Sequence, residues 1–248
     1  MSYSANQAHP ASLHDGLKPS ADDTRVPDYL ARHYWWAYVH PRGVKFFDRT
    51  WILNLILLGQ YRRLREAVLE EFEGVHAQNL LQVSCVYGDL SCRLARRLAA
   101  AGGRIDVVDV LPIQLRNLRW KMPGRMPGRL LHMDSASLGL PDASYDAVLI
   151  FFLLHEQPAE YRARTLGEAM RVLRPGGKLV IVDYAKAAWW NPLRYLCRVI
   201  FALFEPYAFE LLSCDFSAFL PPEMRFERHS YFGGFYQKVV AWKAPATH

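Results

Sequence analysis

The chain has 248 residues, 51% of them hydrophobic, and its 30 Lys and Arg against 24 Asp and Glu leave a formal net charge of +6. This length and composition suffice for one sizeable core and argue against a second full domain. The basic residues are scattered, and no basic run, zinc finger or RNA-binding aromatic motif accompanies them. We therefore predict no nucleic-acid partner, whereas an anionic membrane surface is compatible with the charge.

Cysteine usage and hydropathy indicate the compartment. Cys85, Cys92, Cys197 and Cys214 form no C-x-x-C pair, and the N-terminus lacks a basic and apolar secretory pattern. In the N-terminal half, the longest stretch without a charged residue that is mainly apolar is 50–61. It is well short of the roughly 20 residues that cross a bilayer. We predict a soluble cytoplasmic protein without a transmembrane helix, peripheral on the inner face of the cytoplasmic membrane.

The first part of the chain divides into a tail and a helical segment. Residues 1–27 mix Ser, Ala, Asp, His and Pro without periodicity, which is typical of a disordered tail. Residues 28–72 are helical in pattern and rich in aromatic side chains, with a predicted turn at His40-Pro41-Arg42-Gly43. We interpret 28–73 as an N-terminal helical lid.

After Gly74, short apolar runs alternate with amphipathic helices, the pattern of βαβ units around a parallel sheet. Strands are predicted at 80–84, 105–109, 129–133, 145–151 and 178–183, and helices at 90–101, 112–120 and 160–173. A helical insert at about 188–212 precedes a closing hairpin of strands 224–231 and 235–243. The predicted fold class is α/β, a doubly wound, mostly parallel, seven-stranded Rossmann-like sheet, with 74–248 as one cofactor-binding domain.

Polar side chains follow four of the predicted strands, where open α/β sheets bind their ligands. The loop 84–89 follows the first strand, and Asp109 ends the second, placed to accept hydrogen bonds from ribose hydroxyls. Asp134 follows the third strand. The fourth runs out into His155 and Glu156, which places an imidazole and a carboxylate beside the predicted pocket.

The order of these motifs, followed by Arg-Val-Leu-Arg-Pro-Gly-Gly-Lys-Leu at 171–179, resembles class I S-adenosylmethionine-dependent methyltransferases. The likeness covers about 75–185 and is greatest to enzymes acting on ubiquinone and menaquinone precursors. It implies that Asp109 binds the ribose, that Asp134 lies near the adenine amino group, and that the loop surrounds the methionine part. The implied cofactor-binding residues are Gln82, Ser84, Cys85, Val86, Tyr87, Gly88, Asp109, Val110, Asp134 and Ser135.

The loop after the first strand departs from that family pattern. The family carries an acid followed by G-x-G-x-G, whereas here Gln82 replaces the acid, and Ser84, Val86 and Gly88 stand at the glycine positions. Because glycines at such a turn allow unusual backbone angles and close ligand approach, Val86 and Tyr87 must reshape the pocket. Gln82 also removes a negative charge that, in the family, helps to hold the cofactor's ammonium group.

Together with the aromatic run 34–38, Phe47-Asp48-Arg49 and the loop 83–88, this departure resembles the rhodoquinone-biosynthesis proteins called RquA, over nearly the whole chain beyond the tail. The resemblance implies conversion of ubiquinone to rhodoquinone, with S-adenosylmethionine as amino donor and a Mn²⁺ ion. We hypothesise that Gln82, Val86 and Tyr87 turn the cofactor so that its amine faces the quinone. The alternatives are a quinone-pathway methyltransferase and a non-catalytic scaffold of quinone-synthesis enzymes.

The remaining site predictions concern chemistry at the quinone. Tyr87 and His155 are the catalytic candidates, and His155, Glu156 and Asp183 are the candidate metal ligands, since Mn²⁺ prefers oxygen and imidazole. His155 and Glu156 can equally be satisfied structural groups. The predicted quinone-binding residues are Tyr34, Trp35, Tyr38, Tyr184 and Trp190, although aromatic runs are more often core. In the insert, Lys186, Arg194 and Arg198 among aromatic residues indicate an interfacial helix that admits a polyprenyl tail.

Overall fold

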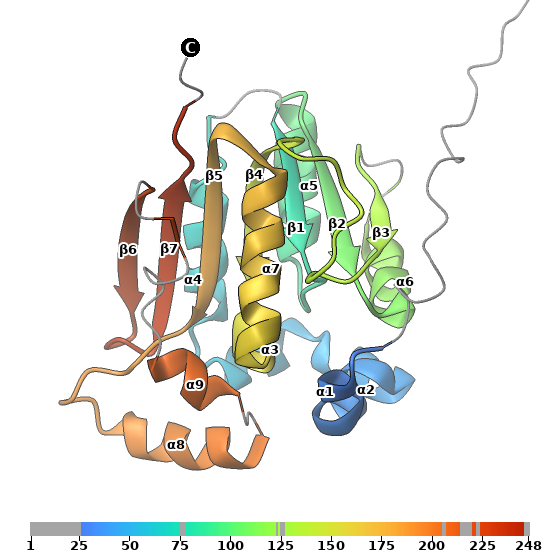
Figure 1. The fold of residues 1–248 in the computed structure, drawn as a ribbon. Helices are drawn as coiled ribbons and strands as arrows, with labels where there is room; N and C mark the ends of the chain where they lie inside the picture. The colour runs from blue at the N-terminus through green and yellow to red at the C-terminus, as the bar shows by residue number, and fades with distance from the viewer. Residues whose placement is uncertain are drawn as a thin grey trace, which may run out of the picture.

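The computed structural model describes residues 26–74, 78–122, 124, 127–204, 207–213, 220–221 and 224–245. Its centre is a seven-stranded sheet with strand order β3-β2-β1-β4-β5-β7-β6 (Figure 1). The strands are β1 (Asn79–Val83), β2 (Arg104–Asp109), β3 (Leu130–His132), β4 (Tyr145–Phe151), β5 (Leu173–Tyr184), β6 (Arg225–Tyr231) and β7 (Tyr236–Trp242). The predicted doubly wound α/β fold is confirmed.

Pairing directions determine where a ligand can lie. β1 pairs in parallel with both β2 and β4, and β5 continues the parallel series, whereas β7 runs antiparallel between β5 and β6. The strand order therefore reverses between β1 and β4, and the loops that leave these two strands diverge at the carboxyl edge of the sheet. This switch point is where the fold leaves room for a ligand.

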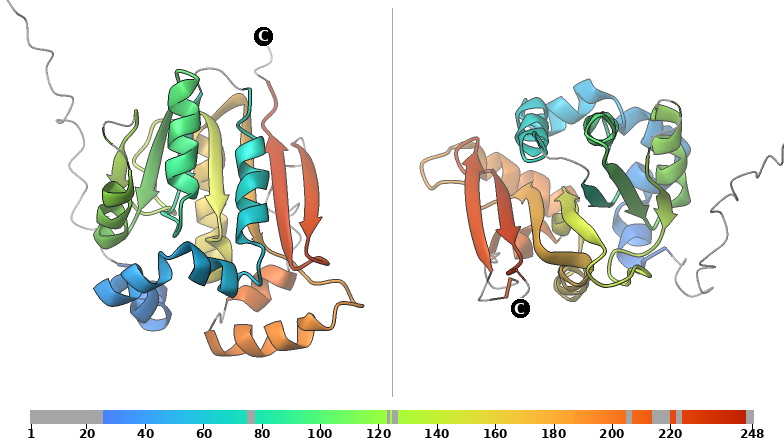
Figure 2. Two further views of the ribbon diagram at one scale, coloured as in Figure 1. Left: turned by 180° about the vertical axis from the view of Figure 1, so that it is seen from behind. Right: turned by 90° about the horizontal axis from the view of Figure 1, so that it is seen from above.

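Helices cover both faces of the sheet. α4 (Tyr61–Glu70), α5 (Leu90–Ala100) and α6 (Pro112–Lys121) lie on one face, and α7 (Ala159–Val172) lies on the other (Figure 2). The inner strands β1 and β4 are buried almost throughout, because helices cover both of their faces. α4 contributes Leu64 and Val68, both fully buried, to the main core. α4 is thus part of the sheet's helical layer, although it lies within the segment predicted as a lid.

The rest of the N-terminal segment lies beyond the carboxyl ends of the parallel strands (Figure 1). It consists of α1 (Asp28–His33), a π-helical turn (Trp35–Val39), α2 (Pro41–Phe47) and α3 (Thr50–Ile56). The predicted turn at 40–43 is wrong, because these residues open α2. The side chain of His40 accepts from the Arg42 N–H, and Pro41 occupies the first helical position, where its missing N–H costs no hydrogen bond.

The C-terminal part contains the predicted insert and hairpin. α8 (Leu193–Phe204) and α9 (Ala208–Ser213) precede the β6–β7 pair and lie at the same end of the molecule as α1 to α3. β5 begins earlier than predicted, at Leu173, because α7 ends at Val172 and the chain extends through the Pro-Gly-Gly turn. Residues 1–25 of the predicted tail lie outside the described residues. None of the described helices combines the length and apolar character that a bilayer-spanning helix requires.

Candidate functional site

A cavity of about 510 Å³ opens at the switch point of the sheet. Its walls come from the loops after β1, β2 and β4, from the N-terminal helices and from Phe201 of α8. Most of the lining side chains are aromatic or aliphatic, and the polar ones gather at the strand ends. An apolar cavity with a few converging polar groups at this edge suits a ligand with one polar and one apolar part.

Asp109 ends β2 and lies buried against the β1 loop. Its Oδ2 accepts from the Cys85 N–H at 2.7 Å, and its Oδ1 accepts from the Leu111 N–H at 2.8 Å. Burial raises the pKa of the Asp109 carboxyl to about 6, and these two backbone donors oppose the rise. The carboxylate is therefore held in position at the edge of the cavity before any ligand arrives.

Asp134 lies across the cavity from the β1 loop, after β3. It caps its own turn by accepting from the Ala136 N–H at 2.8 Å, and its other oxygen accepts from the Tyr161 hydroxyl. Asp134, Ser135 and Val110 all line the cavity, as the sequence predicts for cofactor-binding residues. The adenosine end of the predicted site is therefore assembled from the ends of β2 and β3.

At the first glycine position of the family pattern, the β1 loop has the backbone conformation of a glycine although the residue is Ser84. Ser84 has a φ of +74°, a left-handed angle that side chains usually avoid. The Gln82 Nε2 donates to the Ser84 carbonyl at 3.0 Å, whereas Gln82 Oε1 is buried and has no hydrogen-bond partner among the described residues. A buried unpartnered acceptor is costly unless a ligand satisfies it. Ser84, Cys85, Val86 and Tyr87 line the cavity, whereas the predicted cofactor-binding residues Gln82 and Gly88 do not.

Tyr87 projects from the loop into the N-terminal helices. Its hydroxyl donates to the Ala37 carbonyl at 2.7 Å and accepts from Gln114 Nε2 at 2.8 Å, and its ring stacks on Tyr38 with centroids 5.6 Å apart. Burial raises the pKa of Tyr87, which keeps the phenol protonated at neutral pH. Both partners of this predicted catalytic hydroxyl are structural groups, so Tyr87 ties the loop to the helices that cover it.

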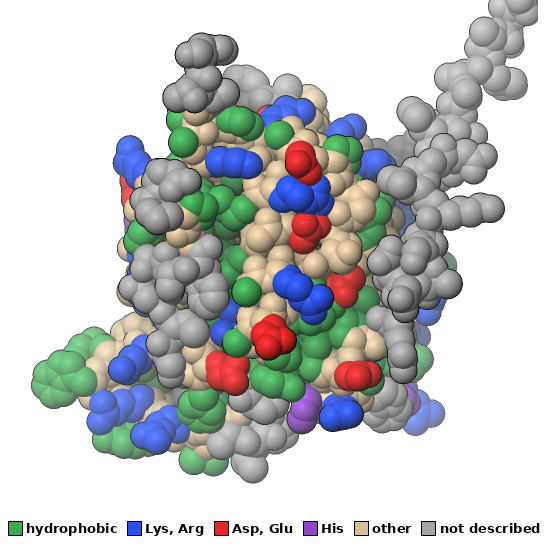
Figure 3. Space-filling model, in the orientation of Figure 1, with side chains coloured by type: hydrophobic (Ala, Val, Ile, Leu, Met, Phe, Trp, Pro, Cys, Tyr) green, Lys and Arg blue, Asp and Glu red, His purple; other side chains and the backbone are tan. Residues whose placement is uncertain are grey.

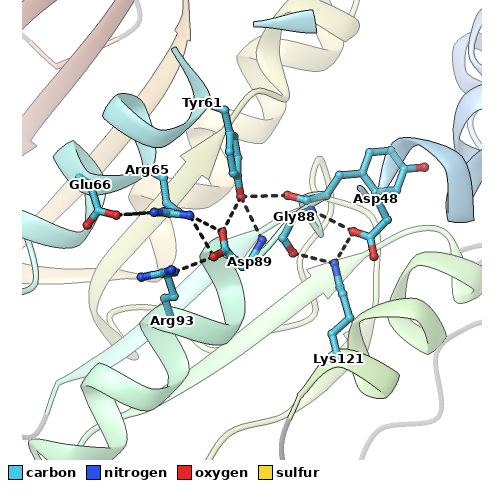
Figure 4. A network of polar contacts seen from close by, with 9 residues as sticks. Asp48, Tyr61, Arg65, Glu66, Gly88, Asp89, Arg93 and Lys121 are labelled. Atoms are coloured by element: carbon cyan, nitrogen blue, oxygen red, sulfur yellow. Dashed lines mark hydrogen bonds and ion pairs between the residues drawn. The ribbon is translucent and has the colours of Figure 1, made fainter. Parts of the chain in front are cut away.

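A second tie joins the same loop to α2 and α6 (Figure 4). Asp48 accepts from the Gly88 N–H at 2.9 Å and from Lys121 Nζ at 2.5 Å, and Lys121 also donates to the Gly88 carbonyl. Gly88 has a φ of +81°, and a Cβ there would lie 2.2 Å from the Tyr61 hydroxyl. Only glycine therefore fits this position.

Tyr61 and Arg65 of α4 complete the network. The Tyr61 hydroxyl accepts from the Asp89 N–H at 3.0 Å, and Arg65 binds both Asp89 carboxylate oxygens at 2.8 and 2.9 Å. Sequence reasoning missed Tyr61, Arg65 and Lys121, because no spacing connects residues of separate helices to the loop. Asp48 had one signal, its place in the Phe47-Asp48-Arg49 motif.

His155, Glu156 and Asp183 lie together, as predicted. The His155 Nδ1 is 2.8 Å from Asp183 Oδ1, and its Nε2 is 3.8 Å from Glu156 Oε1, which also accepts from the Tyr38 hydroxyl. Asp183 additionally accepts from the backbone N–H groups of Leu154 and Tyr184 at 2.9 and 2.8 Å. His155 and Glu156 line the cavity, and Asp183 orients the imidazole from behind.

This geometry does not fit the predicted Mn²⁺ site. Within the described part of the chain, no three His, Cys, Asp or Glu side chains are grouped so that they could hold a metal ion. Asp183 uses both oxygens on protein donors, and Glu156 Oε1 is engaged by Tyr38. His155 is instead hydrogen-bonded to Asp183 and lies beside Glu156.

The predicted quinone-binding residues divide. Tyr34, Tyr38 and Tyr184 line the cavity, and Tyr184 lies edge-on to His155 with ring centroids 4.7 Å apart. The Trp35 side chain lies outside the described residues. Trp190, also predicted to bind the quinone, does not line the cavity: it is 62% exposed and lies over the β6–β7 turn at Gly233.

The chain has the Rossmann-like fold of class I S-adenosylmethionine-dependent methyltransferases. A solved S-adenosylmethionine-dependent methyltransferase from Aquifex aeolicus superposes with a TM-score of 0.53 at 19% identity, covering 82% of this chain and 98% of that one. Residues 81–181 match the family model described as a methyltransferase domain.

Two curated relatives narrow the likeness. The demethylmenaquinone methyltransferase of Thermus thermophilus is 33% identical over 143 residues, 57% of this chain and 63% of that protein. The ubiquinone/menaquinone biosynthesis C-methyltransferase UbiE of Pseudomonas putida is 28% identical over 139 residues, 54% of this chain and 53% of that protein. The chain thus spans between half and two thirds of the length of these relatives.

Proposed function

We propose that the protein is an S-adenosylmethionine-dependent transferase that modifies a quinone of the ubiquinone or menaquinone type. The observation that carries the proposal is the division of the cavity. Asp109 and Asp134 mark a polar end that suits adenosine, and the aromatic walls around Tyr38 and Tyr184 suit a planar apolar ring. The names of the two quinone-pathway relatives support the same substrate class.

Within this class, we propose that the group transferred is the amino group, which replaces a ring methoxy group of ubiquinone to form rhodoquinone. The support is the rebuilt β1 loop, because the acid and two glycines of the methyltransferase pattern are absent. A neutral amine adds to an electrophilic quinone, whereas an ammonium clamped by a carboxylate cannot. At position 82, near the end of β1, the neutral Gln82 stands where the family pattern has a carboxylate.

The proposed amination also needs a residue that moves protons at the quinone ring. Asp183 holds the Nδ1 of His155, which leaves the Nε2 directed toward Glu156. His155 and Glu156 line the cavity. In this proposal the ring C–N bond forms as the ring C–O bond to the methoxy group breaks. His155 takes the proton released from the attacking amine and gives it to the methoxide, which leaves as methanol. The cofactor's Cα–N bond then breaks by elimination: a proton leaves the neighbouring Cβ and ends on the nitrogen, which gives the aminoquinone and an unsaturated cofactor product. Phe152, with a left-handed φ of +53°, lies edge-on to both His155 and Tyr184.

The second candidate is methyl transfer to a quinone precursor, which the names of the curated relatives favour. The purified protein should be incubated with ubiquinone and with S-adenosylmethionine labelled either in the methyl carbon or in the amino nitrogen. Nitrogen label in the quinone product supports amination, and carbon label supports methyl transfer instead. No label from either position would remove both activities and leave the non-catalytic scaffold.

Gln82→Glu tests the role of the loop directly. We expect it to reduce amination strongly while cofactor binding persists, since a carboxylate favours the protonated amine. Gln237→Glu is the matched control, because Gln237 is also a buried strand glutamine outside the cavity lining whose Oε1 has no hydrogen-bond partner among the described residues, but it lies on β7, separated from β1 by β4 and β5. Unimpaired amination in Gln82→Glu would contradict the assigned role.

A further inference from the structure

Large apolar side chains are exposed around the open end of the cavity. α3 exposes Trp51, Leu55 and Ile56, and Leu55, at 70% exposure, also lines the cavity wall. An exposed residue that lines a cavity marks its mouth. A bare apolar rim of this kind is unusual for a protein surface that faces only water.

A second exposed apolar strip lies on the C-terminal insert. Trp189 is 82% exposed, and Tyr195 and Val199, four residues apart on α8, project from the same side of the helix. Phe201 on α8 is buried instead, lines the cavity and packs on Tyr184 with ring centroids 4.8 Å apart. α8 therefore has an inner side at the cavity and an outer apolar side.

The two strips occupy one end of the molecule. α3 and α8 both lie beyond the carboxyl ends of the parallel strands in the front and back views (Figures 1 and 2). Both also contribute side chains to the same cavity. We call the exposed residues of segments 41–56 and 186–199 the rim. Its large apolar members are Phe46, Trp51, Leu55, Ile56, Trp189, Trp190, Tyr195 and Val199.

The rim is also positively charged. Its segments contain six basic residues, Arg42, Lys45, Arg49, Lys186, Arg194 and Arg198, and a single acid, Asp48, which is already paired with Lys121. Hydrophobic and basic side chains gather over α8 at the lower left of Figure 3. Exposed tryptophans interleaved with unopposed Lys and Arg match the headgroup region of an anionic bilayer.

We propose that the rim docks the protein on an anionic phospholipid bilayer and that a polyprenyl quinone passes from the bilayer into the cavity between α3 and α8. The inference rests on the proposed quinone substrate for its second half, whereas the docking itself does not depend on it. A membrane is favoured over a protein partner because the exposed apolar side chains are spread over α2, α3, the turn before α8 and α8 itself, and both rim segments also carry basic residues. Insertion of such tips requires no shape complementarity.

Vesicle binding tests the docking. Sedimentation with phosphatidylcholine vesicles, with and without phosphatidylglycerol, should show binding that needs the anionic lipid and weakens with salt. Trp51→Glu and Val199→Glu, which lie outside the cavity lining, should each weaken binding about tenfold, because the inserted apolar side chain is replaced by a charge that the anionic surface repels. Phe226→Glu is the matched control: it makes the same charge change at an exposed apolar residue of β6, away from the rim, and should bind like wild type.

Three results would overturn the docking: equal binding by all three variants, binding that ignores lipid charge, or a dimer of the wild type that Trp51→Glu dissociates. Turnover then separates docking from the proposed function. Trp51→Glu should process a short-chain, water-soluble quinone normally and a polyprenyl quinone in vesicles poorly. Equal turnover of both quinones would refute entry through the rim, and wild-type protein that docks but processes neither quinone would refute the proposed function alone.

Discussion

The two ends of the cavity are built in different ways. At the polar end, Asp109 and Asp134 each accept from a backbone N–H two residues further on, from Leu111 and Ala136, and Asp109 also accepts from the N–H of Cys85, just after the neighbouring strand β1. The β1 loop is held from outside the sheet: Tyr87 reaches back 50 residues to Ala37, and Gly88 reaches back 40 residues to Asp48. The ends of the strands therefore position Asp109 and Asp134, whereas the N-terminal helices position Tyr87 and Gly88 of the β1 loop.

The largest effect is expected at Gly88, where the β1 loop contacts Tyr61 of α4. Gly88→Ala should lower the free energy of unfolding by about 3 kcal/mol or more, because it combines a left-handed φ with a Cβ overlapping the Tyr61 hydroxyl. Gly102→Ala is the control: its φ of +76° is similar, but no atom lies within 4 Å of the added Cβ, so about 1 kcal/mol is expected. Equal losses in urea unfolding would mean that the α4 contact does not shape the loop.

At the adenosine end, pH should change cofactor affinity. Burial raises the pKa of Asp109 to about 6, so the carboxylate that would accept the ribose hydroxyls is lost as pH falls through that value. Calorimetric titration with S-adenosylhomocysteine should show affinity falling about tenfold between about pH 7 and about pH 5. Asp109→Asn should bind weakly with no such dependence. A wild-type profile that stayed flat would exclude Asp109 from the binding site.

The same shift acts on folding with the opposite sign. Since the folded pKa lies above the unfolded one, the contribution of Asp109 to stability is fully present at low pH and is lost as pH rises through about 6. Cofactor affinity should therefore rise over the pH range in which this contribution to the free energy of unfolding falls.

The smallest expected effect concerns the Tyr87 hydroxyl. Tyr87→Phe should cost about 1 kcal/mol of stability, because the Ala37 carbonyl and Gln114 amide lose a partner while the ring stack on Tyr38 remains. Thermal unfolding of Tyr87→Phe measures this loss of stability. Tyr231→Phe is the control, because the Tyr231 hydroxyl has no hydrogen bond among the described residues. Complete loss of turnover in Tyr87→Phe, with stability unchanged, would restore the catalytic role predicted for this hydroxyl.

Most of the sheet was predictable, because its signals are local. The strand Tyr145–Phe151 has the predicted limits, and the other strands and helices predicted after Gly74 differ by at most one residue at each end, apart from the early start of β5 and the insert, whose first helix begins at Leu193. The turn predicted at 40–43 failed because Pro41 suits both a turn and the first position of a helix, and only the packed chain decides between them. Trp190 was misplaced for a related reason, since composition does not reveal which side of an aromatic segment faces the cavity.

By itself, the sequence determined the doubly wound sheet, the acids at the ends of β2 and β3, and the altered loop after β1, because period, strand ends and loop composition are properties of short stretches of chain. Only the tertiary structure decided that Asp48, Tyr61 and Lys121 hold that loop, that His155, Glu156 and Asp183 form no metal site, and that α3 joins α8 at the cavity mouth. These features arise where helices far apart in the chain meet one edge of the sheet, and no local pattern encodes such a meeting.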